Sequence, residues 1–264
     1  MDEPTFGKRE TVADGVEILP SYLPVPGFGV LPVNAFLLRA AQPMLVDTGL
    51  AMLREGFLSA LSSALDPKTL RWIWVTHTDA DHVGNLAAVL EAAPEARVVT
   101  NYVGMAKMTM LGLPVVERVY LLNPGQSLNV GDRTIQAVRP PTYDAPETTA
   151  LFDPVSRALF SADCFGALLS SPYEDSRQVP ADELDEGLTT WATVDAPWLR
   201  VVDDRLHRQA VTSFLEHKPK TVLSSHLPPA PGMNDRLGEL LNRAIDAPTF
   251  VGPDQAAMEQ RLAR

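Results

Sequence analysis

The sequence predicts a single α/β domain built from two β-sheets with helices outside them. Strands and helices interleave in each half of the chain, and the polar residues gather where strands end. A length of 264 residues fits one large domain, and 45% hydrophobic residues are ample for a sizeable core. We therefore expect ligand-type side chains to meet along one edge of the sheets.

The N-terminal region reads as short strands around an apolar, proline-rich loop. The strands are Gly15–Leu19 and Asn34–Ala40, and the loop covers Tyr22–Val33. Two interpretations of the loop are open: a flexible flap over a functional site, or an ordinary hairpin packed on the sheet.

The next segments alternate between strand and helix. Apolar residues at helical spacing predict the first helix, and a proline lies just beyond each of the two helices. The expected elements are a strand at Met44–Asp47, a helix at Ala51–Leu65, a strand at Leu70–Val75, a helix at Gly84–Ala93 and a strand at Arg97–Thr100.

The second half contains the remaining elements. A Gly131-Asp132 turn and an Asp153-Pro154 turn each join two expected strands. The expected strands are Glu117–Leu121, Ser127–Val130, Arg133–Arg139, Thr148–Phe152, Ala158–Ser161 and Thr221–Ser224, and the expected helices are Tyr102–Leu111, Asp203–His217, Asp235–Ile245 and Asp254–Ala263.

The stretch from Ser170 to Asp195 is polar and acidic, and no clean apolar period predicts a helix in it. A solvated face is one interpretation; the other is a lid or oligomer contact covering residues 170–197. Trp191 and Trp198 fit an interface as readily as the core.

A cluster of metal-binding side chains follows the expected strand at Leu70–Val75. His77, Asp79, Asp81 and His82 occur within six residues, in the loop at the end of that strand. A solvated turn with an aspartate N-cap is the simpler alternative. The chain has only five histidines, and a third one, His226, ends another apolar strand, which favours a dinuclear metal site. Imidazole suits iron, zinc and copper, whereas carboxylates suit harder ions such as iron and manganese.

Composition excludes several classes of function. A net charge of −11 disfavours nucleic acid and anionic membranes as partners. No stretch approaches the length of an apolar membrane span, and the charged N-terminus is unlike a signal peptide, so we expect a cytoplasmic protein. The single cysteine, Cys164, excludes an internal disulfide and is expected to be buried, while His207 and His217 are expected at the surface.

An ordered set of motifs resembles the metallo-β-lactamase superfamily over nearly the whole chain. The motifs are LVDTG at 45–49, HTDADHVGN at 77–85, FSADCFG at 160–166 and LSSH at 223–226. The resemblance implies a four-layer αββα sandwich with a dinuclear metal site at the sheet edges.

Two departures from the superfamily pattern refine the resemblance. The usual HxHxDH motif has Asp79 in place of its second histidine, which is similar to the HxExDH motif of flavodiiron proteins and related oxygen-binding diiron proteins. A further histidine ligand is missing from Arg139–Pro154, and Asp144 lies near its expected position, 67 residues after His77. Tyr143 as the ligand, or a vacant position, are the alternatives.

The resemblance implies a complete ligand set. Metal one would be held by His77, Asp79 and Asp144, and metal two by Asp81, His82 and His226. Asp163 would bridge the two ions, and Asp47 would orient the metal loop by accepting a hydrogen bond. Such an oxygen-rich set favours two iron ions, with manganese or zinc as alternatives.

Three functions follow from this interpretation. The first is a diiron oxidoreductase that binds or activates dioxygen to oxidise a small substrate. Because these residues show neither a flavodoxin domain nor a cysteine set for an iron–sulfur partner, electrons would come from the substrate or an external donor. The second is a hydrolase of an ester, thioester, lactone or lactam. The third is a diiron oxygen sensor. A homodimer is compatible with each of them.

Overall fold

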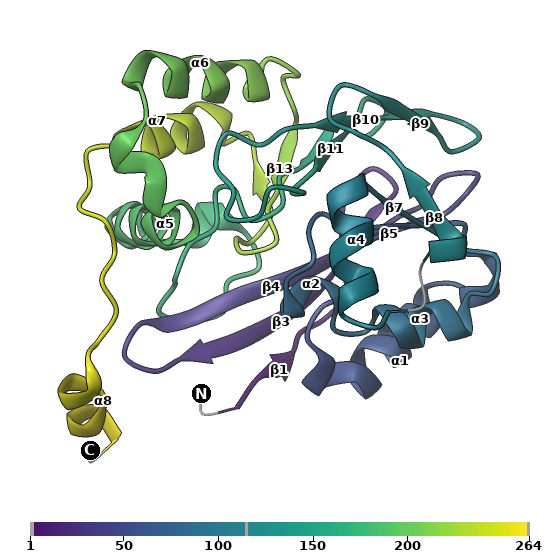
Figure 1. Cartoon of the computed structure of the whole chain (residues 1–264), viewed down its shortest axis with the longest axis horizontal. Coiled ribbons are helices and arrows are strands. Elements are labelled where there is room, and N and C mark those ends of the chain that lie inside the picture. Colours follow the sequence, from purple (N-terminus) through teal and green to yellow (C-terminus); the bar gives the residue numbers. More distant parts are fainter. Residues whose placement is uncertain (1–2, 114–115, 263–264) are drawn as a thin grey trace.

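The computed structural model, which describes residues 3–113 and 116–262, consists of two β-sheets with helices on their outer faces (Figure 1). The first sheet has strands in the order β1-β3-β4-β5-β6-β7-β8, with β2 paired to β3. The second has the order β14-β13-β12-β11-β10-β9. This arrangement confirms the predicted αββα fold class.

The strands of the first sheet are β1 (Thr5–Phe6), β2 (Glu10–Ala13), β3 (Val16–Val25), β4 (Gly29–Leu38), β5 (Met44–Val46), β6 (Trp72–Trp74), β7 (Arg97–Thr100) and β8 (Val119–Leu121). Those of the second are β9 (Ser127–Asn129), β10 (Thr134–Val138), β11 (Ala150–Asp153), β12 (Ala158–Phe160), β13 (Thr221–Leu223) and β14 (Ala230–Pro231). The helices are α1 (Arg54–Ala64), α2 (Ala80–Val83), α3 (Leu86–Ala92), α4 (Tyr102–Met110), α5 (Ala181–Asp195), α6 (Asp204–Leu215), α7 (Asn234–Ala244) and α8 (Gln255–Leu262).

Three buried apolar clusters separate the layers. One joins the first sheet to helices such as α1 and α3 through residues including Phe57 and Val89. A second fills the space between the sheets, where the rings of Phe36 and Phe160 meet edge to face at 5.4 Å. The third joins the second sheet to α5, α6 and α7. Each sheet therefore has one face on the central core and one face under helices.

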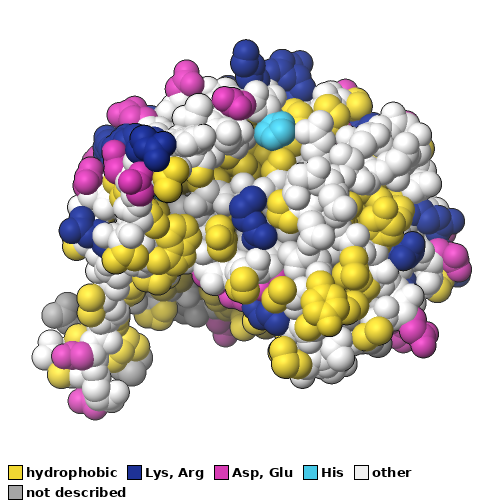
Figure 2. All heavy atoms as spheres, turned by 45° about the horizontal axis from the view of Figure 1, so that its top comes forward, with side chains coloured by type: hydrophobic (Ala, Val, Ile, Leu, Met, Phe, Trp, Pro, Cys, Tyr) yellow, Lys and Arg dark blue, Asp and Glu magenta, His cyan; other side chains and the backbone are white. Residues whose placement is uncertain are grey.

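Helix α8 lies apart from this body, and the connection that leads to it touches the β3–β4 hairpin, where the rings of Phe28 and Phe250 meet at 5.6 Å. Figures 1 and 2 show the C-terminal segment projecting away, with acidic and basic side chains interspersed over the face seen in Figure 2. Among the residues that the structure describes, no helix is long and apolar enough to cross a membrane. The last residue of the predicted C-terminal helix, Ala263, lies outside the described residues.

The Tyr22–Val33 segment is a hairpin packed on the sheet, so the flap interpretation is wrong. Strands β3 and β4 pair over their whole length, from Val16↔Leu38 to Val25↔Gly29. The hairpin also contacts the second sheet's side of the molecule through paired backbone hydrogen bonds between Val30 and Leu169.

The acidic stretch contains a helix that the sequence analysis did not predict. Leu184, Leu188 and Ala192 of α5 recur every four residues and are buried in the outer core of the second sheet. Asp182 and Glu183 lie in the first turn, where negative charge interacts favourably with the helix dipole. Residues 181–195 thus contribute to the core and are not merely a solvated face, while the expectation of a lid or oligomer contact over residues 170–197 stays a prediction.

Two further expectations were incomplete. His207 is buried and its Nε2 lies 3.2 Å from the carbonyl oxygen of Leu241, so the expectation of a surface position is wrong. His217 is half-buried against the ring of Phe152. The short edge strands β1, β2 and β14 were not anticipated, because two to four residues carry too little periodicity to be recognised.

Candidate metal centre

The metal loop follows β6 and leads directly into the short helix α2. Backbone N–H groups of His82 and Val83 donate to the carbonyl of Asp79, which starts that helical turn. This tight turn reverses the chain direction within a few residues, so the rings of His77 and His82 lie with their centroids 3.9 Å apart. Both imidazoles are buried, at 0% and 1% exposure.

Asp47 fixes the orientation of the loop from the end of β5. Its Oδ1 accepts the backbone N–H of Thr76 at 2.8 Å, and its Oδ2 accepts the Thr76 hydroxyl at 2.7 Å. The same Oδ2 lies 2.9 Å from Nδ1 of His82, so Nδ1 donates to this carboxylate and Nε2 is the ring nitrogen available to a metal ion. These contacts suit the anchoring role expected of Asp47.

Gly84 lets the loop and the segment after β5 approach closely. A Cβ at this position would lie 2.4 Å from the carbonyl oxygen of Gly49 and 2.5 Å from the amide nitrogen of Ala51. Thr48 closes the same contact, since its backbone N–H and its hydroxyl both donate to the carbonyl of His82. The LVDTG segment therefore holds the metal loop by the carboxylate of Asp47 together with the backbone N–H and hydroxyl of Thr48.

The second sheet supplies Asp163 and His226 from the ends of β12 and β13. These strands are parallel neighbours, so both side chains leave the sheet at the same edge. Nδ1 of His226 donates to the carbonyl of Pro32 in β4 at 2.7 Å, which turns its Nε2 toward the cluster. Asn34 also crosses between the sheets, donating to the carbonyls of Ser224 and Leu227.

The distances place Asp163 between two groups of ligand-type atoms. Its Oδ2 lies 3.4 Å from Nε2 of His77, while its Oδ1 lies 3.1 Å from Nε2 of His82 and 3.3 Å from Nε2 of His226. Oδ2 of Asp81 is 3.6 Å from Nε2 of His82 and 3.5 Å from Nε2 of His226. One Asp163 oxygen therefore faces each group, as a bridge between two ions requires.

The structure brings all seven predicted ligands together. His77, Asp79 and Asp144 form one group whose potential ligand atoms lie within 4.8 Å of one another, and Asp81, His82 and His226 form another. Asp144, unlike the histidines, is exposed. It comes from the segment between β10 and β11, which is tied to the metal loop where Thr149 donates its N–H to the carbonyl of Thr76.

Unsatisfied buried atoms indicate that these residues fit metal ions. Within the described part of the chain, Nε2 of His77, Nε2 of His82 and Oδ1 of Asp163 are buried without a hydrogen-bond partner. They approach at ion-pair distances but do not meet hydrogen-bond geometry with one another. Because unpartnered buried polar groups are costly, atoms that crowd in this way are best satisfied by cations between them. Imidazole and carboxylate donors suit iron, manganese and zinc.

Electrostatics in the cluster favour positive charge among the carboxylates. Burial lowers the pKa of His82, but Asp163, Asp81 and Asp47 outweigh it and hold that pKa well above its usual range. Burial also lowers the pKa of His226, but the nearby carboxylate of Asp163 outweighs burial and raises that pKa to about 9. Burial raises the pKa of Asp163, yet the three imidazoles lower it well below the usual range. Metal binding would replace these protons.

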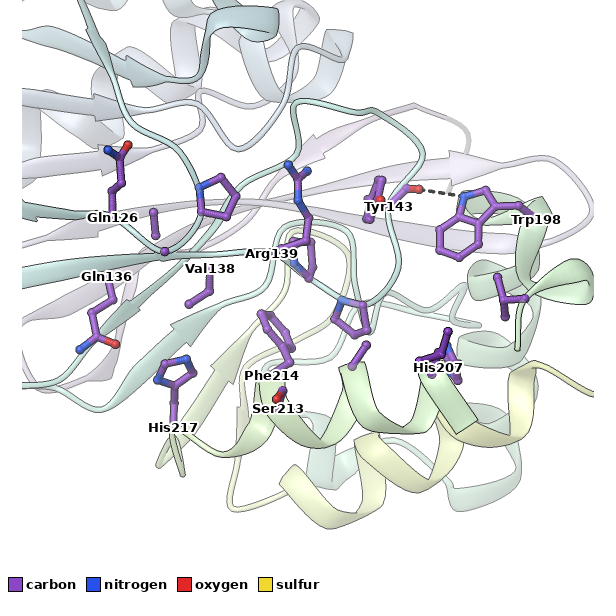
Figure 3. Close-up of a pocket in the computed structure, with 18 of the residues that line it drawn as sticks. Gln126, Gln136, Val138, Arg139, Tyr143, Trp198, His207, Ser213, Phe214 and His217 are labelled. Carbon is purple, nitrogen blue, oxygen red and sulfur yellow. Dashed lines mark hydrogen bonds between the residues drawn. The ribbon is translucent and has the colours of Figure 1, made fainter. Parts of the chain in front are cut away.

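Tyr143 faces away from this cluster, into a cavity of about 870 Å³. Its ring packs against Trp198 with centroids 5.6 Å apart, and the Arg139 guanidinium lies over it at 5.1 Å. Figure 3 shows Trp198 hydrogen-bonded to Tyr143 near one end of the cavity and His217 near the other. The cavity is lined by none of the seven predicted ligands.

Sequence analysis missed Glu147, which supports the metal loop from outside. This carboxylate is fully buried and its Oε1 accepts from the hydroxyl of Thr78 at 2.7 Å and from Nζ of Lys107 at 2.5 Å. Burial raises its pKa, but the two donors lower it below the usual range. Nothing near Glu147 in the sequence signals this role, because Lys107 is 40 residues away.

Asp195, at the C-terminal end of α5, was missed as well. It is 5% exposed, and its carboxylate lies within 4.8 Å of those of Asp144 and Asp163. Burial, and then the charges of Asp163 and Asp144, hold its pKa well above the usual range. Only a prediction of helix α5, from the spacing of its leucines, could have pointed to this residue.

Cys164 follows Asp163 but is separated from the chemistry by burial. The thiol residue is 1% exposed, and burial raises its pKa to about 12. A thiol held in its protonated form is a poor nucleophile and a poor metal ligand.

Comparisons with known proteins show the family and the fold of the chain. A family model described as "ODP family beta lactamase" matches residues 31–226. The chain is 24% identical over 195 residues to a nitric oxide reductase of Moorella thermoacetica, covering 73% of this chain and 48% of that protein. It is 25% identical over 155 residues to the rubredoxin-oxygen oxidoreductase of Megalodesulfovibrio gigas, covering 59% and 39%. Each match spans less than half of the relative.

Solved structures share the fold. The flavodiiron protein of Giardia intestinalis superimposes with a TM-score of 0.77 at 16% identity, covering 92% of this chain and 60% of that one. Rubredoxin oxygen:oxidoreductase from Desulfovibrio gigas gives a TM-score of 0.74 at 19% identity, covering 90% and 61%. At these identities the likeness concerns the backbone fold.

Proposed function

The chain belongs to the ODP β-lactamase family, and from this premise we propose that it holds two metal ions, preferably iron, and uses dioxygen to oxidise a small substrate. The observation that supports this most directly is the position of Asp163, whose Oδ2 faces the buried imidazole of His77 while its Oδ1 faces those of His82 and His226. A bridging carboxylate between two sites is what a cooperating pair of ions needs.

We assign the ligands to two positions. His77, Asp79 and Asp144 would hold metal one, Asp81, His82 and His226 would hold metal two, and Asp163 would serve both. Four carboxylates and three imidazoles make a set richer in oxygen than nitrogen. This composition favours iron, and after it manganese, over zinc.

The surrounding residues hold these ligands for coordination. Asp47 and the Pro32 carbonyl bind the Nδ1 atoms of His82 and His226, which keeps each Nε2 free to bind metal. Trp191 packs against one side of the cluster, with its ring centroid 4.5 Å from that of His226. Two iron ions, when bound, supply the redox chemistry of dioxygen.

The names of the relatives support an oxidoreductase. The Moorella and Megalodesulfovibrio proteins are named as a nitric oxide reductase and a rubredoxin-oxygen oxidoreductase, so both names describe reduction of a small oxidant. The matched part covers less than half of each protein, so the activity of the whole relative is not carried over. We propose that electrons come from the substrate that is oxidised, or from an external donor.

Metal analysis and oxygen uptake test the proposal. Protein purified without chelator is loaded anaerobically with Fe²⁺, freed of excess ion and analysed by elemental mass spectrometry. It is then mixed with aerated buffer in an oxygen electrode while its optical spectrum is recorded. We expect two irons per chain, uptake of dioxygen, and a spectral change that zinc-loaded protein does not show. Two zincs retained against excess Fe²⁺, with no oxygen response after iron loading, would contradict it.

A hydrolase is the second candidate, because the family is described as a β-lactamase and a bridged pair of sites also suits attack by a metal-activated hydroxide. Turnover of ester, thioester, lactone or lactam substrates by zinc-loaded protein would favour this reaction. Reversible dioxygen binding without consumption, by contrast, would favour an oxygen sensor.

A further inference from the structure

The C-terminal end of α5 is built into the metal centre. Nε1 of Trp191 donates to the backbone carbonyl of Asp163 at 3.0 Å, and its ring lies against His226. Gly166 makes this contact feasible, since a Cβ there would lie 2.5 Å from Nε1 of Trp191. Asp195 follows Trp191 by four residues and so projects from the same side of the helix.

The carboxylate of Asp195 lacks the partners that a buried charge requires. Its side chain is in the interior, and Oδ2 has no hydrogen-bond partner among the described residues. The nearest ionisable groups with which it clusters are the carboxylates of Asp144 and Asp163, which repel it when all three are charged. A cation within the group would satisfy all three carboxylates together.

The helix end adds to this preference. Asp195 is the last residue of α5, where the backbone carbonyls of the final turn give the helix a partial negative charge. A cation is therefore favoured at this end by the backbone as well as by the side chain. Asp144 and Asp163 are already ligands of metal one in the proposed function, so the same ion serves all three residues.

We propose that Asp195 is an additional ligand of metal one, completing a set of one imidazole and four carboxylates. This inference rests on the proposed dinuclear site and extends it to a helix that none of the recognised motifs includes. Metal two keeps two imidazoles and two carboxylates, so the two positions differ in hardness. Metal one should prefer Mn²⁺ or iron over Zn²⁺ more strongly than metal two does.

Metal titration tests the assignment without reference to turnover. The parent, Asp195→Asn and the matched control Glu186→Gln are titrated with Mn²⁺ by calorimetry, and the metal retained after dialysis is measured by elemental mass spectrometry. Asparagine preserves the size of the side chain but removes its charge, and Glu186 is an exposed carboxylate of the same helix. We expect Asp195→Asn to bind one of two ions at least about tenfold more weakly, with Glu186→Gln like the parent.

A double-mutant cycle identifies which ion is affected. If Asp144 and Asp195 bind the same ion, the losses caused by Asp144→Ala and Asp195→Asn will not multiply in the double variant. Circular dichroism of the metal-free proteins shows whether each variant is folded; if Asp195→Asn is not, Asp195→Ser removes the carboxylate with a smaller side chain.

The outcomes separate the two proposals. A parent that binds fewer than two ions overturns both the dinuclear site and the role of Asp195. A parent with two ions and an Asp195→Asn variant of equal affinity overturns the role of Asp195 alone. Independent, multiplying losses in the cycle would also overturn the shared ion.

Discussion

Replacing Asp47 by asparagine should weaken metal binding at one position and leave the fold in place. Asp47 is 1% exposed and accepts hydrogen bonds from the backbone and hydroxyl of Thr76 and from Nδ1 of His82. Its φ of 57° is in the left-handed region, which asparagine tolerates better than alanine does. The substitution therefore changes the acceptor and little else: one carboxylate oxygen becomes an NH2 group.

The size of the effect follows from the hydrogen bond to His82. A hydrogen bond to a charged group contributes about 1.5–3 kcal/mol. At about 1.4 kcal/mol for each factor of ten, its loss corresponds to roughly ten- to hundredfold weaker binding. The same range is typical when a partner that orients a ligating histidine is removed. Because His82 belongs to metal two, we expect metal one to be affected far less.

Chelator competition with Mn²⁺ or Zn²⁺ measures both affinities in the parent and in Asp47→Asn. The matched control is Asp153→Asn, since Asp153 is also fully buried and accepts from Val155 and Ser156 in the turn after β11. The control should unfold at lower temperature while keeping its metal affinities. Affinities of Asp47→Asn within about threefold of the parent at both positions would refute the reasoning.

Three further predictions concern the frame of the site. Glu147→Gln should lower the free energy of unfolding by about 1.5–3 kcal/mol at pH 7. Because Lys107 and the Thr78 hydroxyl lower the pKa of Glu147 below its usual 4.5, the difference in unfolding free energy from the parent should shrink as the pH falls below that value. A difference that stays constant in urea titrations down to pH 3 would contradict this prediction. Cys164, with a thiol pKa of about 12, should resist a disulfide reagent at pH 8 until guanidinium unfolds the chain; rapid reaction of native protein would refute its burial. Gly84→Ala should lower the melting temperature by several degrees, because its Cβ would lie 2.4 Å from a backbone oxygen. The control Gly56→Ala in α1, where the nearest atom would be at 3.5 Å, should leave the melting temperature unchanged or raise it. Equal melting temperatures of the two variants would argue against the clash at Gly84.

Six of the seven proposed ligands were predictable from the sequence because they follow apolar strands, whereas Asp144, between β10 and β11, was placed from the superfamily pattern. His77 to His82 form one contiguous segment, and Asp163 and His226 end two strands that prove to be parallel neighbours. Strand alternation and the motif order then gave the fold class. Such features are local, so a single sequence can contain them.

Asp195 and Glu147 were missed because their roles depend on distant contacts. Asp195 reaches its position only when α5 packs on the second sheet. The acidic residues among the leucines of α5 made its apolar spacing hard to recognise in the sequence. Glu147 is defined by Lys107 and Thr78, which arrive from separate elements. For the same reason the Tyr22–Val33 segment could not be distinguished from a flap until its pairing was seen.

The hydrogen bond from Nδ1 of His226 to the carbonyl of Pro32 bears on the rates of folding and unfolding. Its partners are 194 residues apart, and the proposed ligands come from both sheets, so the complete set exists only after the two sheets have docked. Contacts of such long range form late, because loop closure precedes them. We therefore expect bound metal to slow unfolding strongly and to leave the rate of folding almost unchanged. In this protein the bound ions would slow the separation of the two halves of the chain during unfolding.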